Sequence, residues 1–249
     1  MLEIQVAVAK INRHGSTESG DTLETIERPG GGFSFVLVDG EGTGRGAKTL
    51  SNLLVTRAIS LLKDGARDGA VARAVHDYLY TYRMGQVAST LNIVSVDYRS
   101  GKILVSRNNP APFYVIDKRG LHTYNEPSLP IGLHPMIKPQ ITEIAIEPYT
   151  YVVVFTDGLL RAGSHSDEDL ELTNILSGWD AQTGREPREL TDSILQRVLE
   201  IDNGEPSDDM SIITLAVLPD RGHGRVRRMQ MSAHFDGASA PGSAAYETE

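Results

Sequence analysis

The most informative absence in this sequence of 249 residues is cysteine, which does not occur at all. Without thiols the chain can form no disulfide, zinc–thiolate site or cysteine nucleophile, and its composition fits a reducing cytosol. Long apolar runs are missing too, since no segment approaches the roughly 18 uncharged apolar residues that span a membrane. The start, MLEIQVAVAKINRHG, lacks the basic residues and long apolar stretch of a signal peptide. We therefore expect a cytoplasmic protein without membrane association.

Basic residues are in the minority, with 24 Lys and Arg against 33 Asp and Glu, which gives a net charge of −9. No overall positive field attracts the phosphates of nucleic acids, so a nucleic-acid-binding function is not expected. The remaining composition, 40% hydrophobic and 23% charged residues, is that of an ordinary globular protein. At this length the chain holds one large domain or two small ones.

The sequence pattern divides the chain into two parts. Residues 1–218 carry continuous hydrophobic periodicity. By contrast, PDRGHGRVRR, which begins at Pro219 and contains four arginines, is followed by a segment rich in Gly, Ala and Ser. Such a segment buries too little apolar surface to offset its ordering entropy. We predict a folded domain over residues 1–218 and a disordered tail over residues 219–249.

Alternating or β-branched runs, separated by turn signals such as RPGGG and DYRSG, predict nine strands. Helical spacing predicts three helices, two early in the chain and one shortly before the last strand. Because many strands follow one another through short turns, the sheets should be mainly antiparallel, which favours an α+β sandwich covered by helices. The predicted strands are 3–11, 22–27, 33–39, 89–97, 102–107, 112–117, 141–147, 151–157 and 210–218, and the predicted helical faces span 50–62, 71–82 and 190–199.

Acidic residues stand at the ends of three strongly apolar strands. Asp39 and Asp157 each close a strand and precede a glycine, and the pair Asp208 and Asp209 stands directly before the last strand. Carboxylates on rigid strand ends, with a backbone carbonyl and water, form the oxygen-only shell that magnesium and manganese prefer. Asp-Gly is also a common turn dipeptide, so one such pair alone carries little weight. Its repetition at apolar strand ends favours a metal site.

The segment GTGRGAKT, residues 42–49, suggests a different interpretation, because it nearly matches the phosphate-binding loop G-x-x-x-x-G-K-[ST]. However, Ala47 stands where that loop needs its second glycine to let backbone amides approach phosphate. The later strands also lack the crossover helices of a nucleotide-binding sheet. We therefore favour a tight connection from a metal-binding strand into its helix, in which Lys48 is an ordinary exposed residue.

Six motifs in this order resemble the sporulation-stage-II-E-like bacterial branch of the PP2C metal-dependent protein phosphatases. The most specific are FTDGL and a final strand that begins DDMS, and D-G-x-G-x-G strengthens the match. That last motif is most similar to small stand-alone members that reset stressosome signalling. The resemblance extends from about Ile11 to Leu218. The motifs are SGD (19–21), VLVDGEGTGRGA (36–47), ASTLNIVSVDYRSGKILVSRNNPAPFYVIDKRG (88–120), SLPIGL (128–133), VVVFTDGLLRAG (152–163) and DDMSIITLAV (208–217).

The resemblance implies an αββα sandwich of two mainly antiparallel sheets, with two Mn²⁺ or Mg²⁺ ions at one end. Asp39 would bridge both ions and Asp157 and Asp208 would complete the acidic shell, which makes these three the implied catalytic residues. Asp21 matches an acidic position near the second ion. Asp209 is placed behind the direct ligands, although Asp208 and Asp209 could exchange roles. The implied metal-binding set is Asp39, Gly40, Asp157, Asp208, Asp21 and Asp209.

The implied activity is hydrolysis of phosphoserine or phosphothreonine by a water that the two ions activate. The implied partner is a phosphorylated bacterial regulatory protein of the anti-sigma-antagonist (STAS) or stressosome class. No protein nucleophile is needed, which agrees with the absence of cysteine. Two other functions stay open: a non-catalytic phosphoprotein-binding module on the same fold, and a P-loop-like nucleotidase.

A few positions depart from the family pattern or need no functional role. Glu41 stands where eukaryotic relatives place a histidine as a proposed general acid, and it is expected to face water. Lys10 and Arg13 are both candidates for the arginine that contacts substrate phosphate in relatives. The segment 108–110, Asn-Asn-Pro, is expected to form only a turn. Expected at surface or turn positions are His14, His76, His122, His134 and His165.

Overall fold

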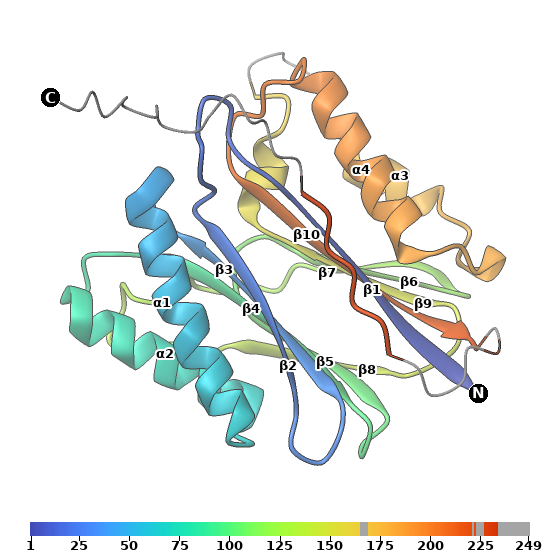
Figure 1. Ribbon diagram of the computed structural model, residues 1–249, viewed down its shortest axis with the longest axis horizontal. Helices are drawn as coiled ribbons and strands as arrows, with labels where there is room; N and C mark the ends of the chain where they lie inside the picture. The colour runs from blue at the N-terminus through green and yellow to red at the C-terminus, as the bar shows by residue number, and fades with distance from the viewer. Residues whose placement is uncertain (165–168, 221, 223–226, 234–249) are drawn as a thin grey trace, which may run out of the picture. The chain divides into compact units, whose positions relative to one another are not determined.

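Two antiparallel sheets of five strands each form the centre of this protein (Figure 1). Residues 1–219 make up one compact unit, and the residues from Asp220 onward belong to a second. The described part of the second unit contains no helix or strand, and most of the predicted disordered tail, 219–249, lies outside the described residues. The computed structural model describes residues 1–164, 169–220, 222 and 227–233.

Each pairing between neighbouring strands is antiparallel, as the short turns between the predicted strands require. The first and last strands of the unit, β1 and β10, pair over their whole length. The first sheet has the order β1 (Leu2–Ile11), β10 (Met210–Pro219), β9 (Thr150–Phe155), β6 (Phe113–Asp117) and β7 (Gly120–Tyr124). The second has the order β2 (Asp21–Glu27), β3 (Phe33–Gly40), β4 (Ser89–Asp97), β5 (Lys102–Asn108) and β8 (Gln140–Ala145).

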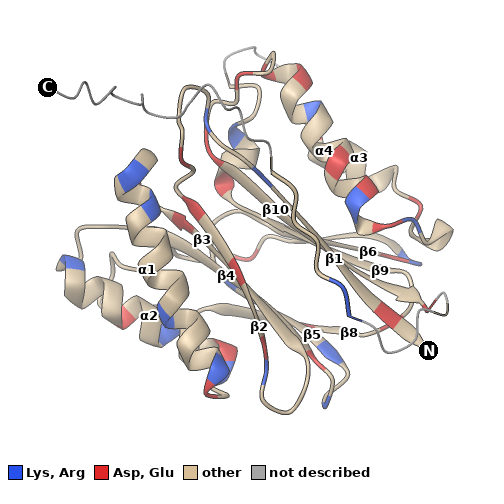
Figure 2. Cartoon of the chain, viewed as in Figure 1, with Lys and Arg blue, Asp and Glu red and all other residues tan. Residues whose placement is uncertain are grey.

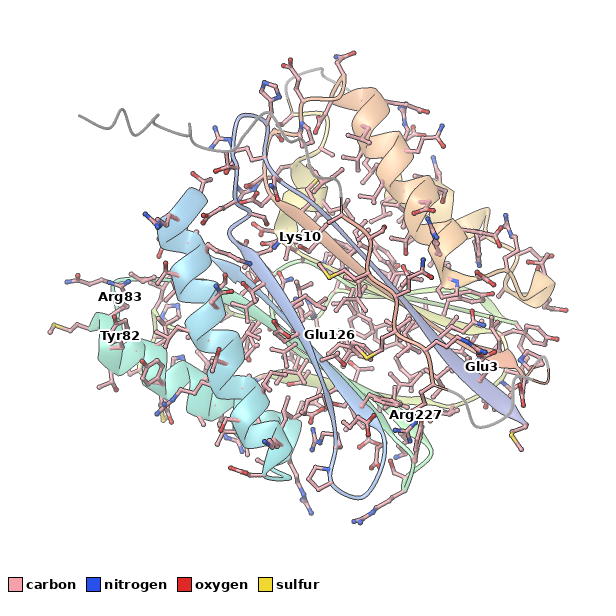
Figure 3. The ribbon with its side chains drawn as sticks, viewed as in Figure 1. Glu3, Lys10, Tyr82, Arg83, Glu126 and Arg227 are labelled. Carbon is pink, nitrogen blue, oxygen red and sulfur yellow. The ribbon has the colours of Figure 1, made fainter. Side chains whose placement is uncertain are left out.

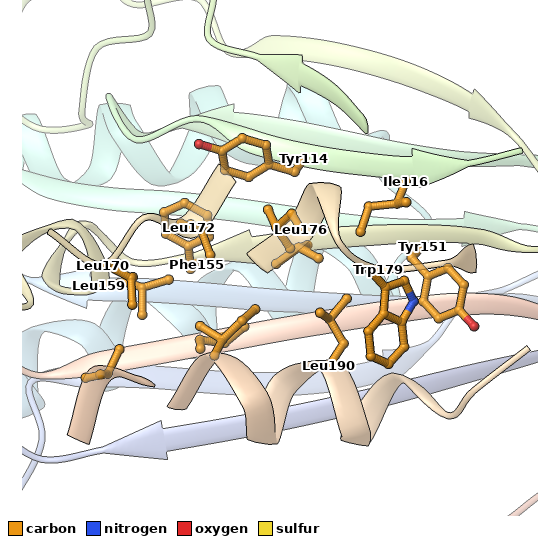
Figure 4. Close-up of a cluster of buried hydrophobic side chains, with 14 of the residues drawn as sticks. Tyr114, Ile116, Tyr151, Phe155, Leu159, Leu170, Leu172, Leu176, Trp179 and Leu190 are labelled. Atoms are coloured by element: carbon orange, nitrogen blue, oxygen red, sulfur yellow. The ribbon is translucent and has the colours of Figure 1, made fainter. Parts of the chain in front are cut away.

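Helices cover the outer face of each sheet, so the layers follow the order helix, sheet, sheet, helix (Figure 1). The second sheet packs against α1 and α2, with Leu54 and Leu79 buried beside Val36 and Ile93. The first sheet packs against α3 and α4, and Figure 4 shows the resulting aromatic and aliphatic cluster. The helices are α1 (Gly44–Lys63), α2 (Asp68–Arg83), α3 (Leu172–Ser177) and α4 (Pro187–Ile201).

A third apolar core fills the space between the two sheets. Because side chains alternate along a strand, Ile93 of β4 faces the helices while Val94 faces the other sheet, where it lies in one buried cluster with Val152. The same alternation along β3 puts Asp39 on the face that carries Phe35, which packs against this inner core. The aspartate therefore stands at the end of a dry inter-sheet layer.

The predicted α+β sandwich is confirmed, and all nine predicted strands are present with ends that differ by at most two residues. One strand and one α-helix of the described residues were not predicted, β7 and α3. Both are short, five and six residues, so neither gives a periodic signal long enough to recognise. The strand predicted over 151–157 ends at Phe155, and Asp157 begins a 3₁₀ turn, η1 (Asp157–Arg161). Among the described residues, no helix combines the length and apolarity needed to cross a membrane.

The end of β5 is a buried anchor, which corrects the expectation that segment 108–110 forms only a turn. Arg107 is 1% exposed. Its guanidinium donates to the carbonyls of Asn109 and Ala111 at 3.0 and 2.7 Å, and to that of Glu126 at 2.6 Å. These three charge-assisted hydrogen bonds hold the turn into β6 and the segment after β7 against the end of the sheet.

Asn108 and Asn109 extend this anchor toward the first sheet. The side-chain amide of Asn108 donates to the carbonyl of Leu129 at 3.1 Å, and that of Asn109 donates to the carbonyl of Phe155 at 3.0 Å. Phe155 is the last residue of β9, two positions before Asp157. The anchor therefore fixes the backbone from which that aspartate leaves the sheet.

Replacing Arg107 by Met should lower the free energy of unfolding by about 2–4 kcal/mol, because three carbonyls lose a charged donor while the side-chain volume is nearly kept. Urea denaturation followed by circular dichroism measures the change. Arg188→Met is the matched control, since Arg188 is an exposed arginine on α4 whose ion-pair partner Asp192 is also exposed, and its loss should leave the midpoint near that of the wild type. An Arg107→Met protein with the wild-type midpoint would contradict the anchor.

Candidate active site

A cavity of about 500 Å³ opens where the ends of the two sheets meet. Three of the predicted carboxylates line it: Asp39 from the second sheet, and Asp157 and Asp208 from segments that flank strands of the first. Gly40 lies on the same wall. Figure 2 shows how acidic and basic residues are distributed over the elements, with basic positions at the N-terminal end of α1. The fold thus brings together carboxylates that are far apart in the sequence.

Asp21 and Asp39 are direct cross-strand neighbours on β2 and β3, so their side chains leave the sheet on the same face. Asp21 is fully buried. Its Oδ2 accepts hydrogen bonds from the hydroxyls of Thr156 at 3.0 Å and Ser211 at 2.6 Å, both from the first sheet's side of the sandwich. Its Oδ1 has no hydrogen-bond partner among the described residues. One carboxylate therefore joins the two sheets and keeps one oxygen unused.

The glycine after each of the two strand-end aspartates is required by close backbone packing. A Cβ on Gly40 would lie 2.2 Å from the carbonyl oxygen of Ala47, and a Cβ on Gly158 would lie 2.0 Å from that of Asp209. Both distances are far below van der Waals contact, so no larger residue fits without moving the backbone. The ligand role of the Gly40 carbonyl, which the family resemblance implies, stays a prediction.

The neighbouring aspartates before β10 have different surroundings. Asp208 lines the cavity. Asp209 is buried, and its carboxylate accepts the backbone N–H groups of Arg13 at 2.9 Å and Gly20 at 2.7 Å. Asp209 therefore fixes the loop between β1 and β2, which brings Arg13 to the cavity and leads into Asp21. Of the two neighbours, Asp208 is the one that reaches the cavity.

Arg161 is a site residue that the sequence analysis did not identify. Its Nη2 donates to Oδ2 of Asp157 and its Nη1 donates to Oδ2 of Asp208, both at 2.8 Å. The only sequence signal for this arrangement is the four-residue spacing between Asp157 and Arg161, which is common on any helical turn. The contact with Asp208 depends on the fold.

Burial and mutual repulsion raise the pKa values of the inner carboxyls. Burial, followed by the charge of Asp21 and the proximity of Asp157 and Asp208, raises the pKa of Asp39 to about 10, so this carboxyl holds a proton at neutral pH. Burial also raises the pKa of Asp21 to about 6, although its two hydroxyl donors oppose the shift. The inner part of the site thus carries more acidic groups than its surroundings can keep ionised.

Two lysines bind the backbone of Asp21. Lys10, labelled in Figure 3, and Lys48 both donate from Nζ to its carbonyl oxygen, at 2.5 and 2.8 Å. Burial, followed by the charge of Lys48, lowers the pKa of Lys10 to about 8. Lys48 is therefore not the ordinary exposed residue that the sequence suggested. Because Lys10 is engaged here, Arg13 is the N-terminal candidate for phosphate contact that lines the cavity.

Two further expectations are corrected by local contacts. Glu41 does not simply face water, because its Oε2 accepts the backbone N–H of Ala88 at 2.6 Å on the cavity wall. His76 is a buried residue of α2, and its Nδ1 accepts the N–H of Gly132 at 3.1 Å. Burial lowers the pKa of His76, which keeps the ring neutral and able to accept that bond. His165, also expected at the surface, lies outside the described residues.

The structure does not support the phosphate-loop interpretation of residues 42–49. Helix α1 begins at Gly44, so residues 45–48 already lie in the helix and do not form an extended cradle of amides. Lys48 is held by Asp21 and Thr22, the latter at 2.9 Å, and does not line the cavity.

The cavity wall fits divalent cations in its chemistry but is not arranged as a finished metal site. It provides oxygen donors, the partnerless Oδ1 of Asp21 lies behind it, and Asp39 holds a proton where a cation would otherwise balance the charge. Throughout the described ranges, however, no three His, Asp or Glu side chains form a group that could hold an ion. Two of the predicted ligands, Asp157 and Asp208, are bound to Arg161 instead.

With metal removed by a chelator, the free energy of unfolding should fall as the pH rises from about 5 to 9. Native Asp39 keeps a proton that the unfolded chain releases above its ordinary pKa of about 4, so the native state binds more protons over this window. Asp39 alone contributes at most about 1.4 kcal/mol per pH unit to this slope. Asp39→Asn should remove most of it and be more stable than the wild type at pH 8.

Urea denaturation at several pH values measures this slope. Asp192→Asn, which neutralises an exposed aspartate on α4, serves as the control and should keep the wild-type profile. Parallel profiles for Asp39→Asn and the wild type would show that Asp39 does not carry the proton.

The comparisons with known proteins agree with this fold. The family model for Stage II sporulation protein E (SpoIIE) matches residues 29–218. The Stage II sporulation protein E of Priestia megaterium is 21% identical over 212 residues, which is 84% of this chain and 36% of that protein. The chain thus spans little more than a third of that relative's length.

Solved structures share the architecture at low sequence identity. The PP2C phosphatase domain of Bacillus subtilis SpoIIE, with a fragment of its regulatory domain, matches with a TM-score of 0.76 at 18% identity, over 87% of this chain and 64% of that one. RsbX in complex with magnesium matches with a TM-score of 0.66 at 14% identity, over 87% of this chain and all of that one. With its family model covering most of the patterned sequence, this chain belongs to the SpoIIE family and has the PP2C-type fold.

Proposed function

We propose that this protein is a metal-dependent phosphatase that hydrolyses phosphoserine or phosphothreonine on a regulatory protein. The observation that carries the proposal is the convergence of Asp39, Asp157 and Asp208 on one cavity at the end of a dry sandwich. Acidic groups this close repel each other, and Asp39 can ionise at neutral pH only if positive charge is brought in. Membership of the SpoIIE family and likeness to PP2C phosphatase domains support the assignment.

Two Mn²⁺ or Mg²⁺ ions would supply that charge. Bound ions of this kind polarise phosphate oxygens and lower the pKa of a coordinated water, which makes a nucleophile available without a reactive side chain. One matched structure, RsbX, is described as a complex with magnesium. The residues proposed to hold the ions are Asp39, the carbonyl of Gly40, Asp157 and Asp208, with Asp21 close to the second ion and Asp209 behind them.

The remaining residues of the site orient and balance these groups. Thr156 and Ser211 hold the Asp21 carboxylate in one direction through their hydroxyls. Asp209 keeps the loop of Arg13 in place, and Arg13 on the cavity wall supplies a guanidinium for the phosphate of the substrate. Ser89 donates to the carbonyl of Asp39 and so supports the strand end that carries the central carboxyl.

The proposed partner is a phosphorylated bacterial protein of the anti-sigma-antagonist (STAS) or stressosome class. Two of the matched structures contain proteins that support this class of partner. One contains the RsbU and RsbW domains of Rv1364c from Mycobacterium tuberculosis, and another is described as part of the bacterial stressosome, a modular system adapted to control secondary messenger signalling. The proposed location of the enzyme is the cytoplasm.

A second candidate is a non-catalytic phosphoprotein-binding module on the same fold. The observation that favours it is the pair of bonds from Arg161 to Asp157 and Asp208, which occupy carboxylate oxygens that a metal would need. The two candidates differ in whether the protein takes up divalent ions.

Purified protein should hydrolyse an aryl phosphate and a phosphoserine peptide in the presence of Mn²⁺ or Mg²⁺ and not with chelator. Asp157→Asn should lower kcat by about a hundredfold or more, because a proposed ligand loses its charge at the reacting centre. Phosphate release with each metal and each variant is the measurement. Asp192→Asn, on the exposed face of α4, should retain the wild-type rate.

Full turnover by Asp157→Asn, or by the wild type in chelator, would rule out the metal-dependent mechanism. Absence of turnover together with absence of bound metal would instead support the binding module.

Arg13→Met should raise KM for the phosphoserine peptide by about tenfold or more with little change in kcat. The variant removes one charge-assisted hydrogen bond to the phosphate and leaves every proposed metal ligand in place. Steady-state kinetics separate the two constants, and Arg119→Met, an exposed arginine outside the cavity, is the control. An unchanged KM would assign phosphate binding to another group.

A further inference from the structure

Among the described residues, Arg161 has two polar side-chain contacts, and both are with proposed metal ligands. Its guanidinium bonds Oδ2 of Asp157 and Oδ2 of Asp208, each at 2.8 Å, and so bridges the end of β9 to the residue two positions before β10. The side chain of Arg161 is 60% exposed, so apolar packing does not hold it in this position. In the described part of the chain, these two carboxylates are the polar groups that hold the guanidinium.

The arrangement differs from an ordinary surface ion pair. Elsewhere on the surface, a guanidinium such as that of Arg188 pairs with one carboxylate, Asp192, one turn along its own helix. Arg161 instead neutralises two carboxylates that the fold forces together at the wall of the cavity, next to a third, Asp39. The single positive charge of Arg161 therefore lies where divalent cations would balance the neighbouring carboxylates better.

Carboxylate oxygens that accept from a guanidinium cannot at the same time bind a metal through the same lone pairs. A bound divalent cation would also repel the guanidinium at this distance. Release is sterically simple, because Arg161 is exposed and is the last residue of the short 3₁₀ turn η1. The side chain can rotate into solvent without any change in the sheets.

We propose that Arg161 is an internal counter-ion that competes with divalent metal for Asp157 and Asp208 and thereby sets the metal affinity of the site. The inference rests on the proposed function, since it concerns the same carboxylates. In the metal-free protein Arg161 stabilises the acidic cluster, and on metal binding both of its ion pairs are given up. Arg161 is a positioning residue that lowers the metal affinity of the site. The protein therefore needs a higher metal concentration to fill the site than it would without Arg161.

The test is metal affinity measured directly. Isothermal titration calorimetry with MnCl₂ should show that Arg161→Met binds Mn²⁺ about four- to sixteenfold more tightly than the wild type, because the metal no longer displaces two ion pairs that are each worth roughly a factor of 2 to 4. Arg188→Met removes the same charge from a similarly exposed position, 70% against 60%, and should stay within about twofold of the wild type. This control separates the local effect from the change in net charge.

A second measurement needs no metal. In chelator, Arg161→Met should melt at a lower temperature than the wild type, because Asp157 and Asp208 lose their counter-ion. In an Asp157→Asn, Asp208→Asn background the same substitution should leave the melting temperature unchanged. A merely structural role for the side chain would lower the melting temperature in both backgrounds and would not tighten Mn²⁺ binding.

Equal or weaker Mn²⁺ binding by Arg161→Met, with normal binding by the wild type, overturns the inference and leaves the proposed phosphatase intact. Weaker binding would mean that Arg161 holds the carboxylates in their ligand geometry. If neither protein takes up Mn²⁺, the metal-dependent function fails and the inference fails with it. Tighter Mn²⁺ binding by Arg161→Met, with Arg188→Met close to the wild type, supports both the inference and the metal-dependent function.

Discussion

The constraint on which this structure depends is negative charge at the end of a dry sandwich. Asp21 and Asp39 are cross-strand neighbours, and their backbone positions are fixed by the ladder between β2 and β3. The apolar layer that begins a few residues away keeps water out and raises the free energy of any unbalanced charge. Strand pairing holds these two carboxyls side by side, so the surrounding residues must neutralise them.

The fold neutralises its acidic residues in three different ways. Asp39 keeps a proton, and its pKa of about 10 is the result. The carboxylate of Asp21 accepts two hydrogen bonds from hydroxyl groups, while two lysines bind the backbone carbonyl of the same residue. Asp157 and Asp208 share the guanidinium of Arg161. A divalent cation would replace the proton and the guanidinium but not the hydroxyl bonds, so the adjustable part of the site is its outer, exposed side.

The sequence predicts the sandwich well because hydrophobic residues recur periodically along its strands and helices. Alternation along β3 and β4 assigns one set of residues to the helices and the other to the inner core, and strand ends then place Asp39 without further information. Asp157 and Asp208 could likewise be singled out, since each stands beside an apolar strand. What could not be predicted depends on contacts between distant segments.

Arg107, Asp209 and Arg161 illustrate that limit. Arg107 is a charged residue within a strand pattern, yet it is buried and donates to three carbonyls. Asp209 was expected behind the metal ligands, but the sequence does not show that it binds two amides about 190 residues away in the chain. Arg161 has a helical spacing to Asp157, but its second partner, Asp208, is 47 residues away. Lys48 was misjudged for the same reason, since helix periodicity exposes it while the carbonyl of Asp21 binds it. Polar residues acquire their roles only when the topology supplies their partners.

Because the sequence identity to proteins of the same fold is low, positions that resist substitution can be distinguished from positions that tolerate it. A TM-score of 0.76 at 18% identity means that most side chains can change while the two sheets keep their positions. Close backbone approaches resist such change, and Gly40 and Gly158 have no room for a Cβ. An exposed residue such as Arg161 meets no such restriction. Within one backbone, the aspartates proposed to bind metal are therefore held by the sheets, while under the proposed competition their metal affinity would be adjusted by a single substitution on the turn beside them.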